Sequence, residues 1–218
     1  MNELSLIDER VNGRNLQETV AANTLSFRDL FAPPFWRPYN MLRAGKGREF
    51  WFRGGRGSTK STFVSEYCAL DMIYDAILYK MGRIPKSMLS HCCIFRKVGV
   101  DLRNSVFPQV QWSLDKLGVS PWFEINNSNL HITFLPTKQQ FQFHGLDDEL
   151  KVKGIKAPFG YYKNTWFEEL TQFHGMKEIR SVKQSVQRGS HGFKTFCTYN
   201  PPMTQASWVN IEANEPVE

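Results

Sequence analysis

A glycine-rich run between residues 54 and 61 has the composition of a phosphate-binding loop. It reads Gly-Gly-Arg-Gly-Ser-Thr-Lys-Ser and lies between a short apolar run and a helical pattern. Glycines let backbone N–H groups turn inward around phosphates, and the amino end of the following helix adds positive partial charge. The lysine would contact the β- and γ-phosphates, and the serine hydroxyl would bind Mg²⁺. The run therefore predicts a site for a nucleoside triphosphate with Mg²⁺.

All eight positions of this loop are assigned to nucleotide contacts. They are Gly54, Gly55, Arg56, Gly57, Ser58, Thr59, Lys60 and Ser61, with Ser61 as the metal ligand. The loop departs from the pattern GxxxxGK[ST] at one position, because Thr59 stands where the second glycine belongs. A β-branched residue there must hold a backbone conformation that glycine adopts freely. The competing interpretation is a glycine-rich turn that binds nothing.

Two adjacent carboxylates, Glu168 and Glu169, follow the apolar pair Trp166-Phe167. A phosphate loop needs one carboxylate at the end of a neighbouring strand to hold Mg²⁺ through water, and another to polarise the attacking water. We assign Glu168 to Mg²⁺ and Glu169 to water activation. Adjacent residues on a strand point to opposite faces, so this assignment requires the chain to turn at the pair. The alternative is a solvated acidic start to the next helix.

A further polar strand end is predicted at residues 198–200, before Pro201-Pro202. If this strand lies beside the phosphate-loop strand, Thr198 or Asn200 reaches the γ-phosphate and can report hydrolysis. A turn that simply ends the strand is the alternative.

The elements that position these residues follow from apolar spacing. Apolar residues at steps of three and four from Phe63 to Met81 predict a helix that Gly82 and Pro85 end. Two more helices are predicted over 100–117 and 177–187. Strands are predicted at 49–52, 90–95, 122–125, 130–135, 139–143, 161–167 and 193–199, the third to fifth forming hairpins. Strands that alternate with helices predict an α/β fold with a mainly parallel sheet and helices on both faces.

Composition favours one folded domain. The 218 residues are 41% hydrophobic and 22% charged, which is enough to bury a core. Residues 1–48 are expected to form an N-terminal arm that ends in an aromatic, proline-rich segment at 27–39, which cannot be one continuous helix. Residues 49–218 are expected to form the phosphate-loop core. The net charge of +6 is compatible with a polyanionic partner, although many proteins that bind no nucleic acid carry a similar charge.

Other site classes find no support in the residues. The four cysteines, Cys68, Cys92, Cys93 and Cys197, lack zinc-ligand spacing and are expected to be buried and reduced. No apolar run approaches the roughly 18 residues of a membrane span, and the first residues do not resemble a signal peptide. We therefore expect a soluble, intracellular protein without a membrane partner.

Five segments, taken in order, resemble those of phage terminase large subunits, the ATPases that drive DNA into a procapsid. They are GGRGSTKS at 54–61, IFRKVGVDLRNSVFPQV at 94–110, FQFHGLDDELKVKG at 141–154, WFEEL at 166–170 and TYNPP at 198–202. The resemblance implies an ASCE-type P-loop NTPase fold with an inserted β-hairpin, and ATP and Mg²⁺ as cofactors. It implies that Glu168 is the acidic Walker B residue, Glu169 the catalytic glutamate and Thr198–Asn200 the coupling motif. Threonine at the second glycine position occurs in this family.

The same resemblance implies further roles. Arg56, with Lys60, would act on the γ-phosphate, and Arg96 or Arg103 would act across a ring interface, unless both are ordinary structural arginines. Phe35, Trp36 or Arg37 would hold adenine, unless this segment is a hydrophobic strap over the core. Lysines of a basic loop could line a DNA channel, or they are a solvated charge run. These are Lys151, Lys153 and Lys156.

The implied partners are double-stranded DNA, a portal protein, a small terminase subunit and further copies in a homo-oligomeric ring, in the cytoplasm of an infected bacterial host. Full-length members carry a C-terminal nuclease with clustered aspartates. No Asp follows Pro202, so no nuclease activity is expected here. We expect ATP hydrolysis that powers translocation of viral DNA. The alternatives are a helicase-like ATPase, which would separate strands, and a nucleotide-binding module without hydrolysis.

Overall fold

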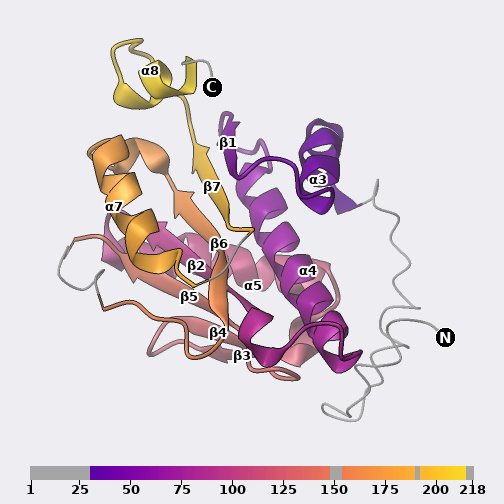
Figure 1. The fold of residues 1–218 in the computed structure, drawn as a ribbon. Helices are drawn as coiled ribbons and strands as arrows, with labels where there is room; N and C mark the ends of the chain where they lie inside the picture. The colour runs from indigo at the N-terminus through magenta and orange to yellow at the C-terminus, as the bar shows by residue number, and fades with distance from the viewer. Residues whose placement is uncertain (1–29, 148–153, 190–191, 215–218) are drawn as a thin grey trace.

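The computed structural model describes residues 30–147, 154–189 and 192–214, and its centre is a seven-stranded sheet (Figure 1). The strands are β1 (Glu49–Arg53), β2 (Ser90–Arg96), β3 (Phe123–Asn126), β4 (His131–Phe134), β5 (Gln140–Gly145), β6 (Tyr161–Glu168) and β7 (Lys194–Tyr199). Their order across the sheet is β1-β7-β6-β2-β5-β4-β3. The first five of this order pair in parallel, whereas β4 and β3 continue the sheet in antiparallel pairs. This confirms the expected α/β class with a mainly parallel sheet and an inserted hairpin.

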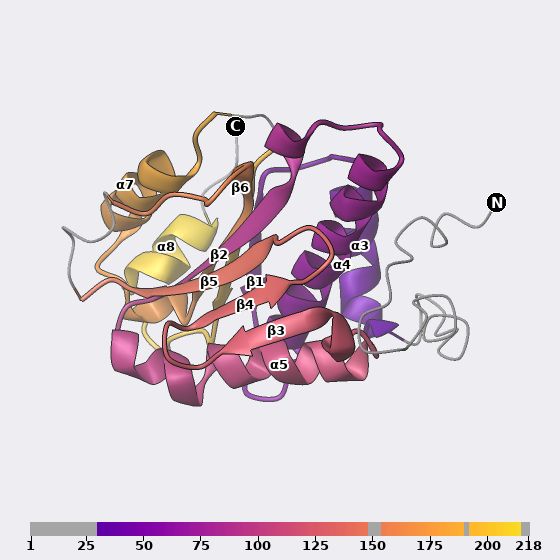
Figure 2. The same ribbon diagram turned by 90° about the horizontal axis from the view of Figure 1, so that it is seen from below.

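Helices cover both faces of this sheet, as Figures 1 and 2 show. The α-helices are α3 (Trp36–Arg43), α4 (Lys60–Lys80), α5 (Val106–Lys116), α7 (Met176–Val186) and α8 (Trp208–Asn214). Short 3₁₀ helices are η2 (Pro33–Phe35), η3 (Lys86–Met88), η4 (Gly99–Asn104), η5 (Ser120–Trp122) and η6 (Leu170–Gln172). Within the described ranges, no helix is both long and apolar enough to pass through a bilayer.

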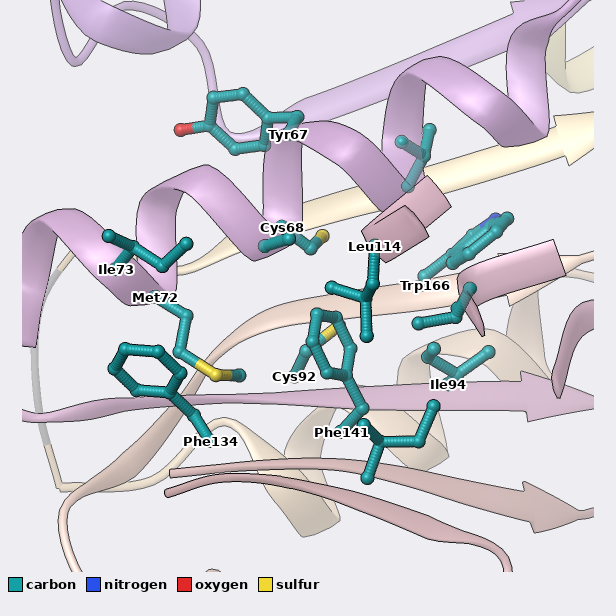
Figure 3. Packing of buried hydrophobic residues seen from close by; sticks show 14 of the residues in the cluster. Tyr67, Cys68, Met72, Ile73, Cys92, Ile94, Leu114, Phe134, Phe141 and Trp166 are labelled. Carbon is teal, nitrogen blue, oxygen red and sulfur yellow. The ribbon is translucent and has the colours of Figure 1, made fainter. Parts of the chain in front are cut away.

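The buried side chains of β2 pack into two separate core layers, one on each face of the sheet, because neighbouring side chains of a strand point to opposite faces. Cys92 and Ile94 belong to the layer under α4 and α5, and Cys93 and Phe95 to the layer under α7. In Figure 3, Cys68 and Met72 of α4 lie on the same side of the sheet as Cys92 and Ile94 of β2. All four cysteines are buried and free of disulfides, as the sequence predicted.

Three elements differ from the sequence predictions. The helix expected over 100–117 is broken into η4 and α5, because Ser105 leaves the helical region at φ −132° and ψ −97°. Its hydroxyl donates to the Asp101 carbonyl at 2.6 Å, a local hydrogen bond that competes with helix continuation. The short helices α3 and α8 were not predicted. The segment 27–39 is not continuous helix where it is described, since η2 gives way to α3 at Trp36.

Gly160, immediately before β6, lies very close to the backbone of Leu89, and this contact leads to a prediction about stability. A Cβ atom there would lie 2.0 Å from the Leu89 carbonyl oxygen, and its φ of +57° strains any other residue. We expect Gly160→Ala to lower the free energy of unfolding by about 1–3 kcal/mol in urea titrations. Gly82→Ala is the matched control, because Gly82 has φ +68° but no atom within 4 Å of its Cβ position. Equal losses in both variants would contradict a steric origin.

Candidate nucleotide-binding site

The glycine-rich loop connects the end of β1 to the start of α4, at the carboxyl edge of the parallel strands. Gly54 N–H donates to the Tyr199 carbonyl at 3.2 Å, which ties the loop to the end of β7. A Cβ atom on Gly54 would lie 2.6 Å from Ser58 Oγ, and Gly57 has φ +76°. These two glycines are therefore required by the tight path of the loop.

Thr59 takes the left-handed conformation that the glycine pattern demands at this position. Its φ and ψ are 56° and 14°, and it is the residue that precedes the first turn of α4. Its carbonyl accepts the Phe63 N–H at 2.9 Å, the first hydrogen bond of the helix. The threonine therefore preserves the helix start at a conformational cost that glycine would avoid.

Lys60 links the loop to the end of β7. Its ammonium Nζ donates to Asn200 Oδ1 at 2.8 Å and to the Gly55 carbonyl at 3.4 Å. Of the two coupling candidates, only Asn200 reaches the loop lysine. Thr198 is buried, and its hydroxyl accepts the Trp166 indole N–H at 2.9 Å, between β6 and β7.

The strand that carries the acidic pair does not adjoin β1, contrary to the expectation of a neighbouring strand. β7 pairs with β1 on one side and with β6 on the other, so it separates them. Asn200 and the two glutamates nevertheless gather at one edge of the sheet, because the carboxyl ends of all three parallel strands lie there.

Glu168 ends β6 in a largely buried position, with a side chain that is 12% exposed. Burial raises the pKa of this carboxyl to about 7, and Glu169 adds to the rise, while Arg96 and Lys60 oppose it. The Arg96 Nε and Glu168 Oε2 atoms are 3.2 Å apart, but neither atom has an aligned hydrogen bond among the described residues. An unsatisfied, buried carboxylate oxygen is suited to accept hydrogen bonds from water bound to a metal ion.

Mg²⁺ fits this set of donors. The half-buried Ser61 stands in the first turn of α4, and Glu168 Oε2 has no aligned hydrogen bond, although Arg96 Nε lies 3.2 Å from it. Within the ranges that the structure describes, no three His, Cys, Asp or Glu side chains gather as a complete metal cage. Mg²⁺ usually takes one or two protein ligands and completes its shell with water and substrate phosphates.

The backbone turns at the acidic pair, as the assignment of two different roles requires. Glu169 has φ 55° and ψ 56°, and the 3₁₀ helix η6 begins at the next residue. The side chain of Glu169 therefore need not point to the face of the sheet opposite to that of Glu168. It also lies close enough to Glu168 to raise the pKa of that carboxyl.

The arginine candidates occupy different surroundings. Arg96 has a 9% exposed side chain and contacts Glu168 and, at 3.4 Å, Gln172 Oε1. Arg103 donates to the carbonyls of Asn127 and Ser128 in the β3–β4 turn. These contacts favour roles within one subunit over the expected role across an interface. Arg56 is exposed on the loop.

The residues predicted to hold adenine lie near the start of the described chain. Phe35 is 7% exposed, and its ring stacks on Phe63 at 4.6 Å, which favours a core role over stacking on a base. The Trp36 indole donates to the Phe31 carbonyl at 2.7 Å, and Arg37 is exposed. Of the basic loop, Lys151 and Lys153 lie outside the described residues, and Lys156 is exposed.

Sequence reasoning missed Glu66 on α4. This carboxylate is 0% exposed and lines a cavity of about 210 Å³ that also includes Thr59 and Thr62. A single glutamate in a mostly apolar helix carries no spacing pattern that would distinguish it from an ordinary surface residue.

Comparisons with known proteins agree with one another. The family described as phage terminase large subunit matches residues 47–213. The large terminase subunit of Bacillus phage SPP1 is 30% identical over 184 residues, which cover 83% of this chain and 40% of that protein. The chain therefore spans about two fifths of the length of this curated relative.

Solved structures of low sequence identity share the fold. The large terminase of a thermophilic bacteriophage has a TM-score of 0.54 at 16% identity, over 82% of this chain and 39% of that one. The HK97 bacteriophage large terminase gives 0.53 at 12%, over 84% and 36%. The bacteriophage Phi-29 viral genome packaging motor assembly gives 0.55 at 14%, over 87% and 52%. These likenesses confirm the expected P-loop fold of the ASCE type.

Proposed function

Because this chain belongs to the phage terminase large subunit family, we propose that it hydrolyses ATP to drive double-stranded DNA into a viral procapsid. The observation that carries the proposal is the meeting of Lys60, Asn200 and the pair Glu168–Glu169 at one edge of the sheet. A lysine in a phosphate loop with carboxylates at nearby strand ends is the arrangement that nucleoside triphosphate hydrolysis needs.

Each residue then has one task. Lys60 exchanges its contact with Asn200 for the β- and γ-phosphates of ATP, and Arg56 adds positive charge on the solvent side. Ser61 and Glu168 would hold Mg²⁺, which neutralises phosphate charge when bound. Glu169 orients the attacking water and accepts its proton.

Coupling to movement is proposed to begin at Asn200. When Lys60 turns to the phosphates, Asn200 loses its 2.8 Å hydrogen bond, and the chain beyond β7 is released from the loop. That chain leads through Pro201 and Pro202 to α8, which is docked by the Trp208 indole donating to the Phe173 carbonyl at 2.8 Å. Phe173 directly follows η6, so α8 contacts the segment next to Glu169.

The proposed partners are those of the family. They comprise duplex DNA, a portal protein, a small terminase subunit and other copies in a ring. The net charge of +6 supports contact with DNA but does not identify the contacting residues. A cation supplied across a ring interface also stays a prediction.

Phosphate release from Mg·ATP tests the proposal, with Lys60→Ala beside the wild type. We expect the variant to lose about 10²- to 10³-fold in rate, because the ammonium contact to the β- and γ-phosphates is lost. Lys177→Ala, an exposed lysine on α7, is the control and should retain the wild-type rate. Equal rates in wild type and Lys60→Ala would contradict hydrolysis at this loop. Duplex DNA should remain paired during turnover, since strand separation would indicate a helicase instead.

A further inference from the structure

The cavity of about 210 Å³ begins where the phosphate loop ends. Thr59 immediately precedes Lys60, Thr62 immediately follows Ser61, and both line the cavity. Its apolar walls include Phe31 and Phe35 from the segment before α3, and Trp112 of α5. A flat heterocycle joined to phosphates in the loop would therefore enter a space with aromatic walls.

One polar atom in this cavity has no partner. Glu66 is 0% exposed, and its Oε1 accepts from Lys116 Nζ at 2.7 Å. Its second oxygen, Oε2, is buried and receives no hydrogen bond from any residue that the structure describes. A buried carboxylate oxygen without a donor is unfavourable by the desolvation of that oxygen. A donor that reached Oε2 would remove this cost.

Lys116 is the hydrogen-bond partner of Glu66 Oε1. Burial raises the pKa of Glu66, and the hydrogen bond and positive charge of Lys116 oppose that rise without reversing it. Lys116 is itself held in place, because its ammonium also donates to the Leu30 carbonyl at 3.1 Å and lies over the Trp112 ring. Glu66, a residue that lines the cavity, therefore keeps one buried acceptor, Oε2, to which no described residue donates.

We propose that Glu66 selects adenine, with Oε2 accepting a hydrogen bond from the 6-amino group of the base. The inference rests on the proposed nucleotide site and adds the group that reads the base. Guanine would bring its 6-oxo oxygen against Oε2, and these two acceptors repel. Turned to its other edge, guanine would present two adjacent donors, of which Oε2 can satisfy one because Oε1 is engaged by Lys116.

The test compares two ligands that differ only at position 6 of the purine base. These are Mg·ADP and the diphosphate of purine riboside, which carries hydrogen in place of the 6-amino group. Isothermal calorimetry of the wild type should show about tenfold or more weaker binding of the second ligand, because a hydrogen bond to a charged group is lost. Glu66→Gln should bind the two ligands within about twofold of each other, because Lys116 would orient the amide with its oxygen toward Nζ and its NH₂ donor in the place of Oε2. Glu124→Gln, an exposed glutamate on β3, is the control and should discriminate as the wild type does.

Each outcome has one meaning. Equal affinities of the wild type for the two ligands would overturn the role of Glu66, even if Glu66→Gln fails to fold. Unchanged discrimination in a folded Glu66→Gln variant would overturn it as well. Neither result would contradict the proposed function, since both ligands still bind. If neither ligand binds the wild type at all, the proposed function fails, and the role of Glu66 fails with it.

Discussion

Glu169→Gln should lower steady-state phosphate release from Mg·ATP by about 10²- to 10⁴-fold, because the amide cannot accept a proton from the attacking water. The substitution preserves size and removes only charge and basicity. Glu169 sits at the turn after β6, where its left-handed backbone frees it from the alternation of the strand. Affinity for Mg·ADP should stay within about threefold of the wild type, because the phosphate contacts are assigned to the loop.

The matched control is Glu124→Gln, which makes the same chemical change on the exposed edge strand β3. It should leave the rate of phosphate release unchanged. If Glu169→Gln and the wild type release phosphate at the same rate, Glu169 is not the base. If that shared rate also equals the rate of Lys60→Ala, the chain binds nucleotide without turning it over.

Asp71→Ala should lower the free energy of unfolding by about 3–5 kcal/mol, the range for breaking a buried ion pair on one side. Asp71 is 6% exposed on α4 and accepts from Lys163 Nζ at 3.0 Å and Asn164 Nδ2 at 2.9 Å. Lys194 Nζ lies 3.4 Å from the same carboxylate. Without Asp71, the two ammonium groups remain beside each other, and only Asp75 offers Lys163 a carboxylate.

Urea titration at neutral pH measures this loss, with Asp115→Ala, an exposed aspartate on α5, as the control. Burial alone would raise the pKa of Asp71, but Lys163 and Lys194 hold it below its ordinary value. A lowered pKa means that the stabilisation by Asp71 is present above its unfolded pKa and disappears as the pH falls through the folded one. A loss below about 1 kcal/mol at neutral pH would show that the network relaxes or admits water instead.

The elements could be predicted from sequence because apolar runs at the right period also fill the core. The strand expected at 161–167 is β6 at Tyr161–Glu168, and the one expected at 193–199 is β7 at Lys194–Tyr199. The order of the strands could not be predicted this way. Nothing local indicates that β7 lies between β1 and β6, or that Lys60 meets a residue 140 positions later.

The elements and residues that were not predicted from the sequence also have a physical explanation. Helix α8 is short and depends on tertiary contacts, such as that of the Trp208 indole with the Phe173 carbonyl, which no periodicity records. The loop residues could be proposed from the sequence because glycine and lysine at fixed spacing imply a backbone conformation and a charge. The unsatisfied oxygen of Glu66 was missed because it becomes visible only when burial and partners are known.

The buried hydrogen bond between Trp166 and Thr198 has a mechanical consequence. It fastens β6 to β7 at the level where Glu168 pairs with Thr198. The carboxylates and the end of β7 are therefore held together. Strand β6 could slide along β7 only if this buried hydrogen bond broke first. Beyond Tyr199 the chain leaves the sheet, so α8 is held by side-chain contacts, such as that of the Trp208 indole with the Phe173 carbonyl, and not by strand pairing.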